Sequence, residues 1–180
     1  MTLDGVVFSL KHDLKYLRPR IALWLFNFIP DFYSLSFIRN YILRLGGAKV
    51  PGRHAYIRSP LYCSDLRGIE ICEGVFVNSG CRFQGTSPIY IGANSQIGPQ
   101  CCFETVDHLP SGDILDRPIY IAEHTWLGAK VIVVGGKNIG AGATIAAGAV
   151  VTKNIPANTT WGGVPAREII SSKKDALKNQ

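Results

Sequence analysis

The sequence predicts an all-β fold in which the chain winds as a parallel β-helix, and two observations lead to this prediction. Large apolar residues recur every six positions from Ile57 onward, and the 180 residues include 19 glycines but a single methionine. A period of six does not fit an α-helix, whose faces recur every 3.6 residues. It does fit short extended segments separated by bends, three to a coil, with coils stacked about 4.8 Å apart through parallel strands.

The repeat holds at sixteen positions, all of them apolar or cysteine: Ile57, Cys63, Ile69, Ile71, Val77, Phe83, Ile89, Ile91, Ile97, Phe103, Ile121, Leu127, Val133, Ile139, Ile145 and Val151. The residue after each is often small, which suits a corner where one backbone crowds another. Each inward side chain is expected to pack between the coils above and below, so the column is stable only as a stack.

Breaks in the repeat locate an insertion. Ile71 and Ile91 are 20 residues apart, one 18-residue coil plus two, whereas Ile91 and Ile121 are 30 apart. An extra loop of about 104–118 is therefore predicted, and its Pro110, Gly112 and Pro118 are typical of a surface segment. In a regular rod, the one irregular excursion is where function is expected.

The two ends of the rod need caps, because a β-helix otherwise exposes its edge strands. We expect a helical N-terminal cap at 1–50, the β-helix at 51–163, and a C-terminal helix or tail at 164–180. The apolar, aromatic and arginine-rich cap would pack on the domain or on a sister subunit, or else rest on a membrane interface. Its longest apolar run, 21–29, is nine residues, short of the roughly 20 that cross a bilayer.

The charge composition limits the kinds of partner that the protein is expected to bind. The 19 Lys and Arg against 13 Asp and Glu give a net charge of +6, which suits an anionic partner such as a nucleotide-like cofactor. No basic stripe with interleaved aromatics follows the repeat, which argues against nucleic acid. Five cysteines without a CxxC pair, and a start unlike a secretory leader, indicate a reduced, cytoplasmic protein.

His108 is the one histidine inside the insertion, where it is either a solvated loop residue or a proton acceptor near neutral pH. His124 is expected on the surface. A metal site is not expected, because no histidines are closely spaced and Cys63, Cys72 and Cys81 are nine apart, which is not a multiple of six.

Three motifs carry a resemblance: WLG at 126–128, AGAVVTK at 147–153 and GVPAREI at 163–169. The chain resembles the hexapeptide-repeat O-acetyltransferases, which include galactoside and maltose acetyltransferases and acetyltransferases of surface-polysaccharide and lipopolysaccharide synthesis. The resemblance implies a left-handed parallel β-helix, a homotrimer with active sites between subunits, and acetyl-CoA as acetyl donor without a metal.

The resemblance also implies roles for individual residues. His108 would be the general base, and Asn78 would contact the acceptor beside the histidine of a neighbouring subunit. Asp107 is a candidate for substrate binding and, with Glu104 or a backbone carbonyl, for orienting the His108 ring. Six further residues would bind acetyl-CoA. Trp126 would flank the pocket, Ala129 and Ala147 would lie along the pantetheine arm, and the phosphates would meet Thr152, Lys153 and Arg167.

Differences from the sugar acetyltransferases indicate what kind of acceptor to expect. The sugar acetyltransferases carry an acidic residue where this chain has Thr86, and their inserted loop is longer. We therefore expect transfer of acetyl to a sugar hydroxyl of a bulky or lipid-linked surface glycan. The alternatives are a non-glycan acceptor (a drug, an amino acid or an amino sugar) and a β-helix scaffold without catalysis.

Overall fold

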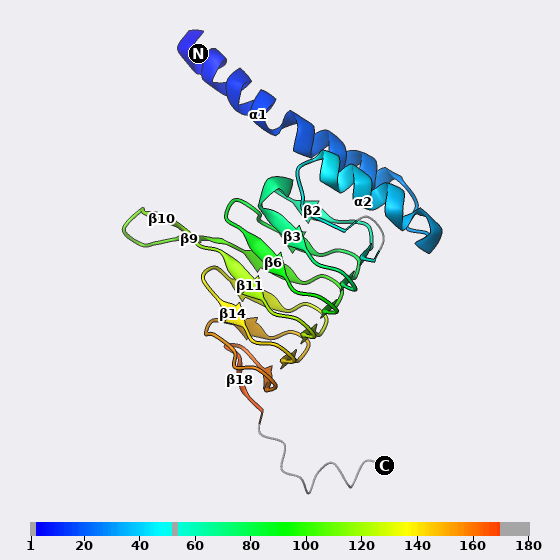
Figure 1. Ribbon diagram of the computed structural model, residues 1–180. Helices are drawn as coiled ribbons and strands as arrows, with labels where there is room; N and C mark the ends of the chain where they lie inside the picture. Colours follow the sequence, from blue (N-terminus) through cyan, green and yellow to red (C-terminus); the bar gives the residue numbers. More distant parts are fainter. Residues whose placement is uncertain (1–2, 52–53, 170–180) are drawn as a thin grey trace, which may run out of the picture.

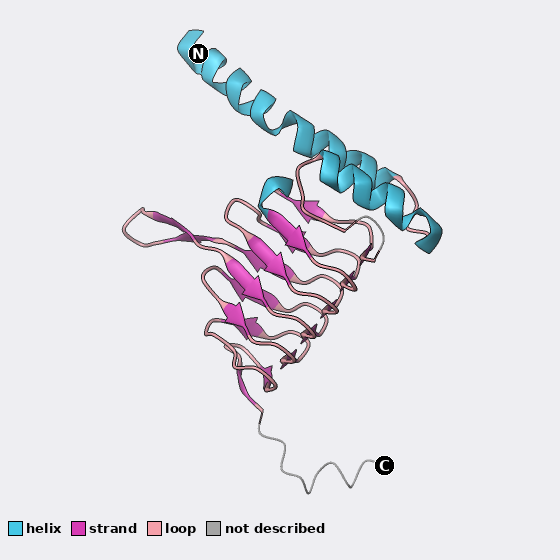
Figure 2. Cartoon of the chain, in the orientation of Figure 1, coloured by secondary structure: helices cyan, strands magenta, loops and turns pink. Residues whose placement is uncertain are grey.

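The chain forms a triangular prism with two helices across one end (Figures 1 and 2). The computed structural model describes residues 3–51 and 54–169. Three largely parallel sheets make the faces, which confirms the predicted β-helix. Sheet A contains β3 (Ile69–Ile71), β6 (Ile89–Ile91), β11 (Ile119–Ile121) and β14 (Asn138–Ile139).

Sheets B and C complete each coil, because the chain passes from a strand of A to one of B and then C. Sheet B contains β1 (Tyr56–Ile57), β4 (Phe76–Val77), β7 (Gln96–Ile97), β12 (Trp126–Leu127), β15 (Thr144–Ile145), β17 (Thr160–Gly162) and β18 (Arg167–Glu168). Sheet C contains β2 (Tyr62–Cys63), β5 (Arg82–Phe83), β8 (Cys102–Glu104), β13 (Ile132–Val134) and β16 (Val150–Val151).

The core is the column of residues at the six-residue period. Of the sixteen expected inward positions, fifteen are buried with at most 4% exposure, and Cys63 is half-buried. The strands pair in parallel register, so that Ile91 lies between Ile71 and Ile121 in neighbouring coils. Phe83 and Phe103 stack with ring centroids 4.7 Å apart, a geometry that adds to the area the rings bury.

The corners explain the small residues of the repeat. A Cβ at Gly92 would lie 2.5 Å from the backbone nitrogen of Glu123 in the next coil, so a side chain does not fit there. At the corner between sheets A and B, Asn94, His124 and Asn158 adopt φ values of 58°, 56° and 57°, a left-handed region that these residue types tolerate. His124 is exposed and serves a turn.

Helices α1 (Leu3–Phe28) and α2 (Ser36–Leu45), joined through the 3₁₀ turn η1 (Tyr33–Leu35), cover the first coil. Asn27 of α1 donates to the Leu61 carbonyl at 2.9 Å and accepts from the Leu61 amide at 2.8 Å. Asn40 of α2 donates to the Ala55 carbonyl at 2.9 Å. These bonds fix both helices on the prism.

The other end of the prism is closed by strand pairing. β18 returns antiparallel to β17, with Arg167 opposite Gly162. The described part of 164–169 is thus turn and strand, and the C-terminal helix expected beyond it lies outside the described residues. A second 3₁₀ turn, η2 (Leu66–Gly68), precedes β3.

Candidate active site

A hairpin interrupts the prism at one corner. β9 (Val106–His108) and β10 (Ile114–Asp116) pair antiparallel between β8 of sheet C and β11 of sheet A. It occupies the predicted insertion and projects from the side of the prism (Figure 1). Every residue of β10 is exposed, so the hairpin is held mainly by its own backbone pairing.

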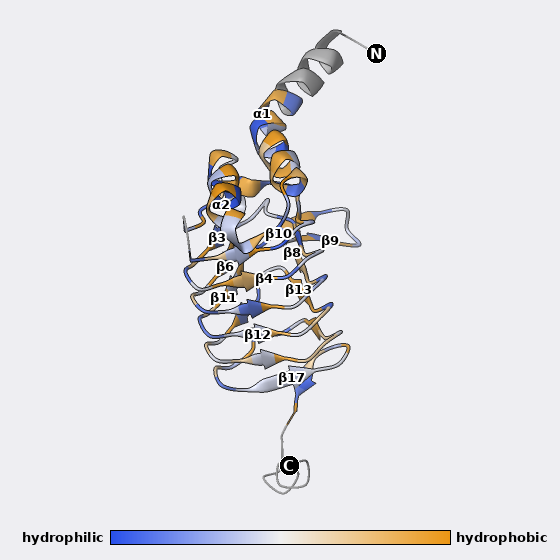
Figure 3. Ribbon diagram, turned by 90° about the vertical axis from the view of Figure 1, so that its right-hand side faces the viewer, coloured by the Kyte–Doolittle hydropathy of each residue, from blue (hydrophilic) through white to orange (hydrophobic). Residues whose placement is uncertain are grey.

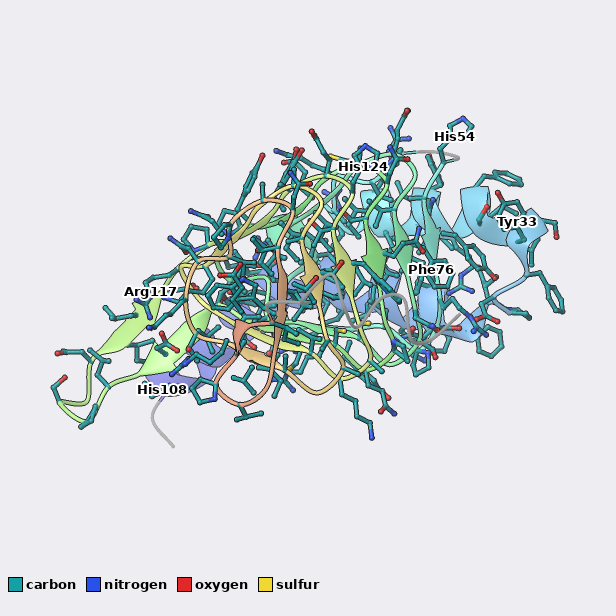
Figure 4. All side chains as sticks on the ribbon, turned by 90° about the horizontal axis from the view of Figure 1, so that it is seen from below. Tyr33, His54, Phe76, His108, Arg117 and His124 are labelled. Atoms are coloured by element: carbon teal, nitrogen blue, oxygen red, sulfur yellow. The ribbon has the colours of Figure 1, made fainter. Side chains whose placement is uncertain are left out.

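His108 lies on β9, opposite Ile114, with its side chain exposed. Successive side chains of a strand point to opposite faces. Figure 4 accordingly shows His108 on the face of the hairpin away from Arg117, the partner of Asp107. Within residues 3–51 and 54–169 the His108 ring has no hydrogen-bond partner, so the imidazole is open to a ligand.

The two carboxylates considered as partners for the His108 ring are both engaged by arginines. Asp107 forms an ion pair with Arg117 at the base of the hairpin. Glu104 forms one with Arg82 at 2.9 Å. The structure therefore does not bring either carboxylate to the imidazole, and the substrate contact of Asp107 stays a prediction.

A second group of expected site residues lies along a different corner, in the turns from sheet B to sheet C. Asn78 follows β4 there, Ala129 follows β12 and Ala147 follows β15. The Asn78 side-chain oxygen accepts a hydrogen bond from the Ser79 amide at 2.8 Å, which fixes the amide group. The two alanines belong to a stripe of small residues, in which the Ala129 carbonyl accepts from the Gly148 amide at 2.8 Å. Trp126, 60% exposed, lies beside this stripe on β12.

The cationic residues expected at the cofactor phosphates are exposed and lie toward the end of the prism remote from the helices. Thr152 and Lys153 follow β16, in the turn from sheet C to sheet A. Arg167 lies on β18 at the edge of sheet B. Thr152 and Lys153 therefore share a corner with the hairpin, two coils farther along.

The expected site is thus divided between two corners that flank sheet C. His108, Thr152 and Lys153 lie at the C–A corner, whereas Asn78, Ala129 and Ala147 lie at the B–C corner. A single chain does not bring Asn78 and His108 together.

Sequence reasoning missed two residues at the base of the hairpin. Arg117 holds Asp107, and Thr105 shares a hydrogen bond of 3.0 Å with the hydroxyl of Thr86. Arg117 could have been noticed in the sequence, because it is the one Lys or Arg in the 104–118 loop. It stands directly before Pro118, where the six-residue repeat resumes. Neither contact follows from periodicity, because both lie where the period is broken.

The Cys102 thiol, near the site, is not poised to react. Burial, with the hydrogen bond to Glu104, raises the pKa of Cys102 to about 12, so the thiol stays protonated at neutral pH. Among the described residues, no three His, Cys, Asp or Glu side chains converge as metal ligands would. The exposed imidazole of His108 is the group at this site suited to proton transfer.

The comparisons with known proteins agree with this architecture. No family model matches the sequence. The chain is 31% identical over 131 residues to the putative colanic acid biosynthesis acetyltransferase WcaF of Escherichia coli K12, covering 71% of each protein. It is 32% identical over 121 residues to a galactoside O-acetyltransferase of Lactococcus lactis, of which it spans 58%. It spans 61% of the galactoside O-acetyltransferase of E. coli K12.

Solved structures share the fold over most of its length. A maltose O-acetyltransferase from Clostridium difficile 630 superposes with a TM-score of 0.78 at 30% identity, covering 88% of this chain and 86% of that one. A hexapeptide-repeat acetyltransferase from Vibrio cholerae, crystallised with acetyl coenzyme A, gives a TM-score of 0.79 at 26% identity, covering 88% and 87%.

Fold and hairpin together define the class: a left-handed parallel β-helix with one inserted loop. The chain belongs to the hexapeptide-repeat acetyltransferase family, as its coverage of WcaF and of the maltose enzyme shows.

Proposed function

We propose that the protein transfers acetyl from acetyl-CoA to a hydroxyl of a sugar, in the synthesis of a surface polysaccharide or lipopolysaccharide. The observation that carries the proposal is the hairpin, which interrupts the regular prism and presents the open imidazole of His108. Family membership supports the acetyl donor, because related structures hold acetyl-CoA or CoA.

In the proposed reaction, His108 removes the proton from the acceptor hydroxyl as the oxygen attacks the thioester carbonyl. A C–O bond forms, the C–S bond breaks, and the CoA thiolate receives the proton that the imidazole holds. Such general base catalysis contributes about 10²- to 10⁴-fold. The protonated state of Cys102 agrees with direct transfer rather than an acyl-enzyme.

The proposed donor site follows the small-residue corner. The pantetheine arm would run along Ala129 and Ala147, where short side chains leave backbone groups free to bond its amides, with Trp126 at the side. Lys153 and Arg167 would meet the phosphates, since cations are the required partners there, and Thr152 would add a hydroxyl donor.

The divided site supports a homotrimer. Three copies with sheet C turned toward a threefold axis would set the B–C corner of each beside the C–A corner of the next. Most outward residues of sheet C suit burial, since Tyr62, Cys102, Ile132 and Val150 carry no charge. Arg82, in the same row, is paired with Glu104 at 2.9 Å. Asn78 of one copy would then hold the acceptor beside His108 of the next.

The acceptor is proposed to be part of a larger glycan. Thr86, in place of an acidic residue, lies at the hairpin base and offers no carboxylate of its own to a small free sugar. The similarity to WcaF, whose name refers to colanic acid biosynthesis, points in the same direction. A drug, amino acid or amino sugar as acceptor would be revealed by the same assay.

The test is thiol release from acetyl-CoA with a panel of glycans, free sugars and amines. His108→Asn is expected to lower kcat about 10²- to 10⁴-fold while CoA still binds. His124→Asn is the matched control, because asparagine tolerates the left-handed turn, and it should leave kcat unchanged. If the His108→Asn variant keeps its turnover, His108 is excluded as the general base. If the native chain acetylates none of the acceptors, the scaffold alternative is favoured.

The division of the site between copies has its own test. His108→Asn and Asn78→Ala chains, each nearly inactive, are mixed, unfolded and refolded together. Random threefold assembly would give about a quarter of the sites both native residues, and hence about a quarter of the native activity. A site within one chain would recover none.

A further inference from the structure

Helix α1 has two apolar faces, and α2 and the first coil cover only one of them. Ala22 and Phe26 are buried against the molecule. On the other side, six large side chains are between 38% and 75% exposed: Leu14, Leu17, Ile21, Trp24, Leu25 and Phe28. At 3.6 residues per turn, these six fall within about 100° of the helix circumference, the width of a buried stripe in an ordinary amphipathic helix.

Helix α2 continues this surface. Phe37, Ile38, Tyr41 and Leu45 are exposed on the side away from its buried residues. A groove of about 380 Å³ joins the two helices, lined by Leu17, Ile21 and Leu25 of α1 and by Ile42 of α2, among others. Figure 3 shows apolar residues along both helices at this end of the molecule. We call this continuous surface of α1 and α2 the outer helical face.

Cations border the outer helical face. Between Asp13 and Pro51 the chain has five exposed Lys and Arg, besides the buried Arg39, but only two acidic residues, Asp13 and Asp31. Both acids contact arginines, Asp13 with Arg20 at 3.6 Å and Asp31 with Arg58 at 2.9 Å. On α1, Arg18 and Arg20 fall on opposite sides of the apolar stripe, so the stripe has a cationic border along both edges.

We propose that the outer helical face binds an anionic lipid surface, with α1 and α2 lying in the plane of the membrane. Apolar residues flanked by cations, with Trp and Phe among them, form the pattern that lies at the headgroup boundary. Trp24 and Phe28 stack with centroids 5.6 Å apart and form one exposed aromatic unit. The helices lie on the surface, since no described helix is long and apolar enough to cross a membrane.

Charge distinguishes a lipid surface from a second copy of the chain. Self-association through this face would bring two cationic borders together, and like charges at an interface oppose association. The two acids of the region are already paired within one chain. Lipid phosphates, in contrast, complement both borders at once. The inference is independent of the proposed enzymatic activity.

Vesicle co-sedimentation of the full chain tests the proposal. Vesicles of phosphatidylcholine with 30% phosphatidylglycerol are compared with pure phosphatidylcholine, at low and high salt. We expect binding to the anionic vesicles that is at least about tenfold stronger than to neutral ones and weakens with salt. No binding to anionic vesicles at low salt overturns the proposal.

Paired variants then locate the contact. Trp24→Ala with Phe28→Ala, and separately Arg20→Gln with Arg44→Gln, should each weaken binding to anionic vesicles about tenfold or more. The matched controls on the prism, Tyr120→Ala and Lys130→Gln with Lys137→Gln, should leave vesicle binding unchanged. The replaced side chains are exposed, apart from the half-buried Lys137, and melting curves check that each variant folds.

Light scattering tests a second copy as the occupant. The mass of the assembly in solution should be the same for the native chain and for Trp24→Ala with Phe28→Ala. The alternative outcome is that those substitutions reduce the mass of the assembly and that the native chain does not bind anionic vesicles. The outer helical face would then be an interface between copies, and the lipid proposal would be wrong.

Discussion

The prism and the hairpin hold their residues in opposite ways. In the prism, each inward residue is packed between its counterparts in adjacent coils, as Ile91 is between Ile71 and Ile121. In the hairpin, β10 is exposed throughout, and one ion pair links its two sides. The first arrangement fixes a rigid support, and the second lets a side chain reach outward from it. Binding and catalytic residues are commonly carried on such projections from a rigid scaffold.

The largest effect should come from removing a ring in the prism. Phe103→Ala deletes one member of the Phe83–Phe103 stack in a site with no solvent exposure. Cavities of this kind cost about 3–5 kcal/mol of unfolding free energy, because the surrounding coils cannot collapse around the space. Chemical denaturation of both proteins at one protein concentration measures the loss.

The matched change in the hairpin is Ile114→Ala. This side chain is 62% exposed, so its removal should change the free energy of unfolding by about 0.5 kcal/mol or less. Comparable losses in the two variants would contradict the distinction between the regions.

Periodicity explains why the prism was predictable and the hairpin only in part. Phe103 and the other inward positions were identified because each repeats the environment of its neighbours six residues away. The insertion was located by the failure of that period, and His108 by lying within it. The Asp107–Arg117 pair was not predictable, since no repeat relates residues inside an irregular loop. For the apolar N-terminal cap, the sequence left open whether it packs on the protein or on a membrane, because it does not tell which side of a helix the prism covers.

A smaller effect should follow from releasing the hairpin at its base. Asp107→Asn and Arg117→Gln each remove the ion pair, and each should lower kcat about tenfold, because His108 would be less well positioned. The double variant should be no worse than either single one, since both remove the same interaction. The measurement is kcat and KM with a fixed acceptor.

A positioning role has a signature that general damage lacks. The KM for acetyl-CoA should stay unchanged, since neither side chain lies on the corner proposed for the pantetheine. Arg117→Lys keeps the charge and should recover part of kcat. A fall in melting temperature in step with kcat, or no recovery by lysine, would indicate a structural role instead.

The smallest effect belongs to η2, where an ion pair helps to secure the chain. Burial opposes ionisation of Asp65, but the hydrogen bonds and charge of Arg67, at 2.6–3.1 Å, outweigh it and hold the pKa of the carboxyl below its usual value. A pKa lower in the folded state stabilises the fold above the unfolded pKa of about 3.9, and the contribution is lost as pH falls through the folded value. Asp65→Asn keeps an oxygen for the Arg67 amide, so it should cost only about 1 kcal/mol of unfolding free energy at pH 7. The difference from the native protein should shrink below about pH 4.

Denaturation at pH 7 and pH 3 measures this difference. The control is Glu70→Gln in the exposed pair with Lys49, which is expected to change stability by about 0.5 kcal/mol or less. A pH-independent loss in Asp65→Asn would mean that packing, and not the charge of Asp65, secures this turn.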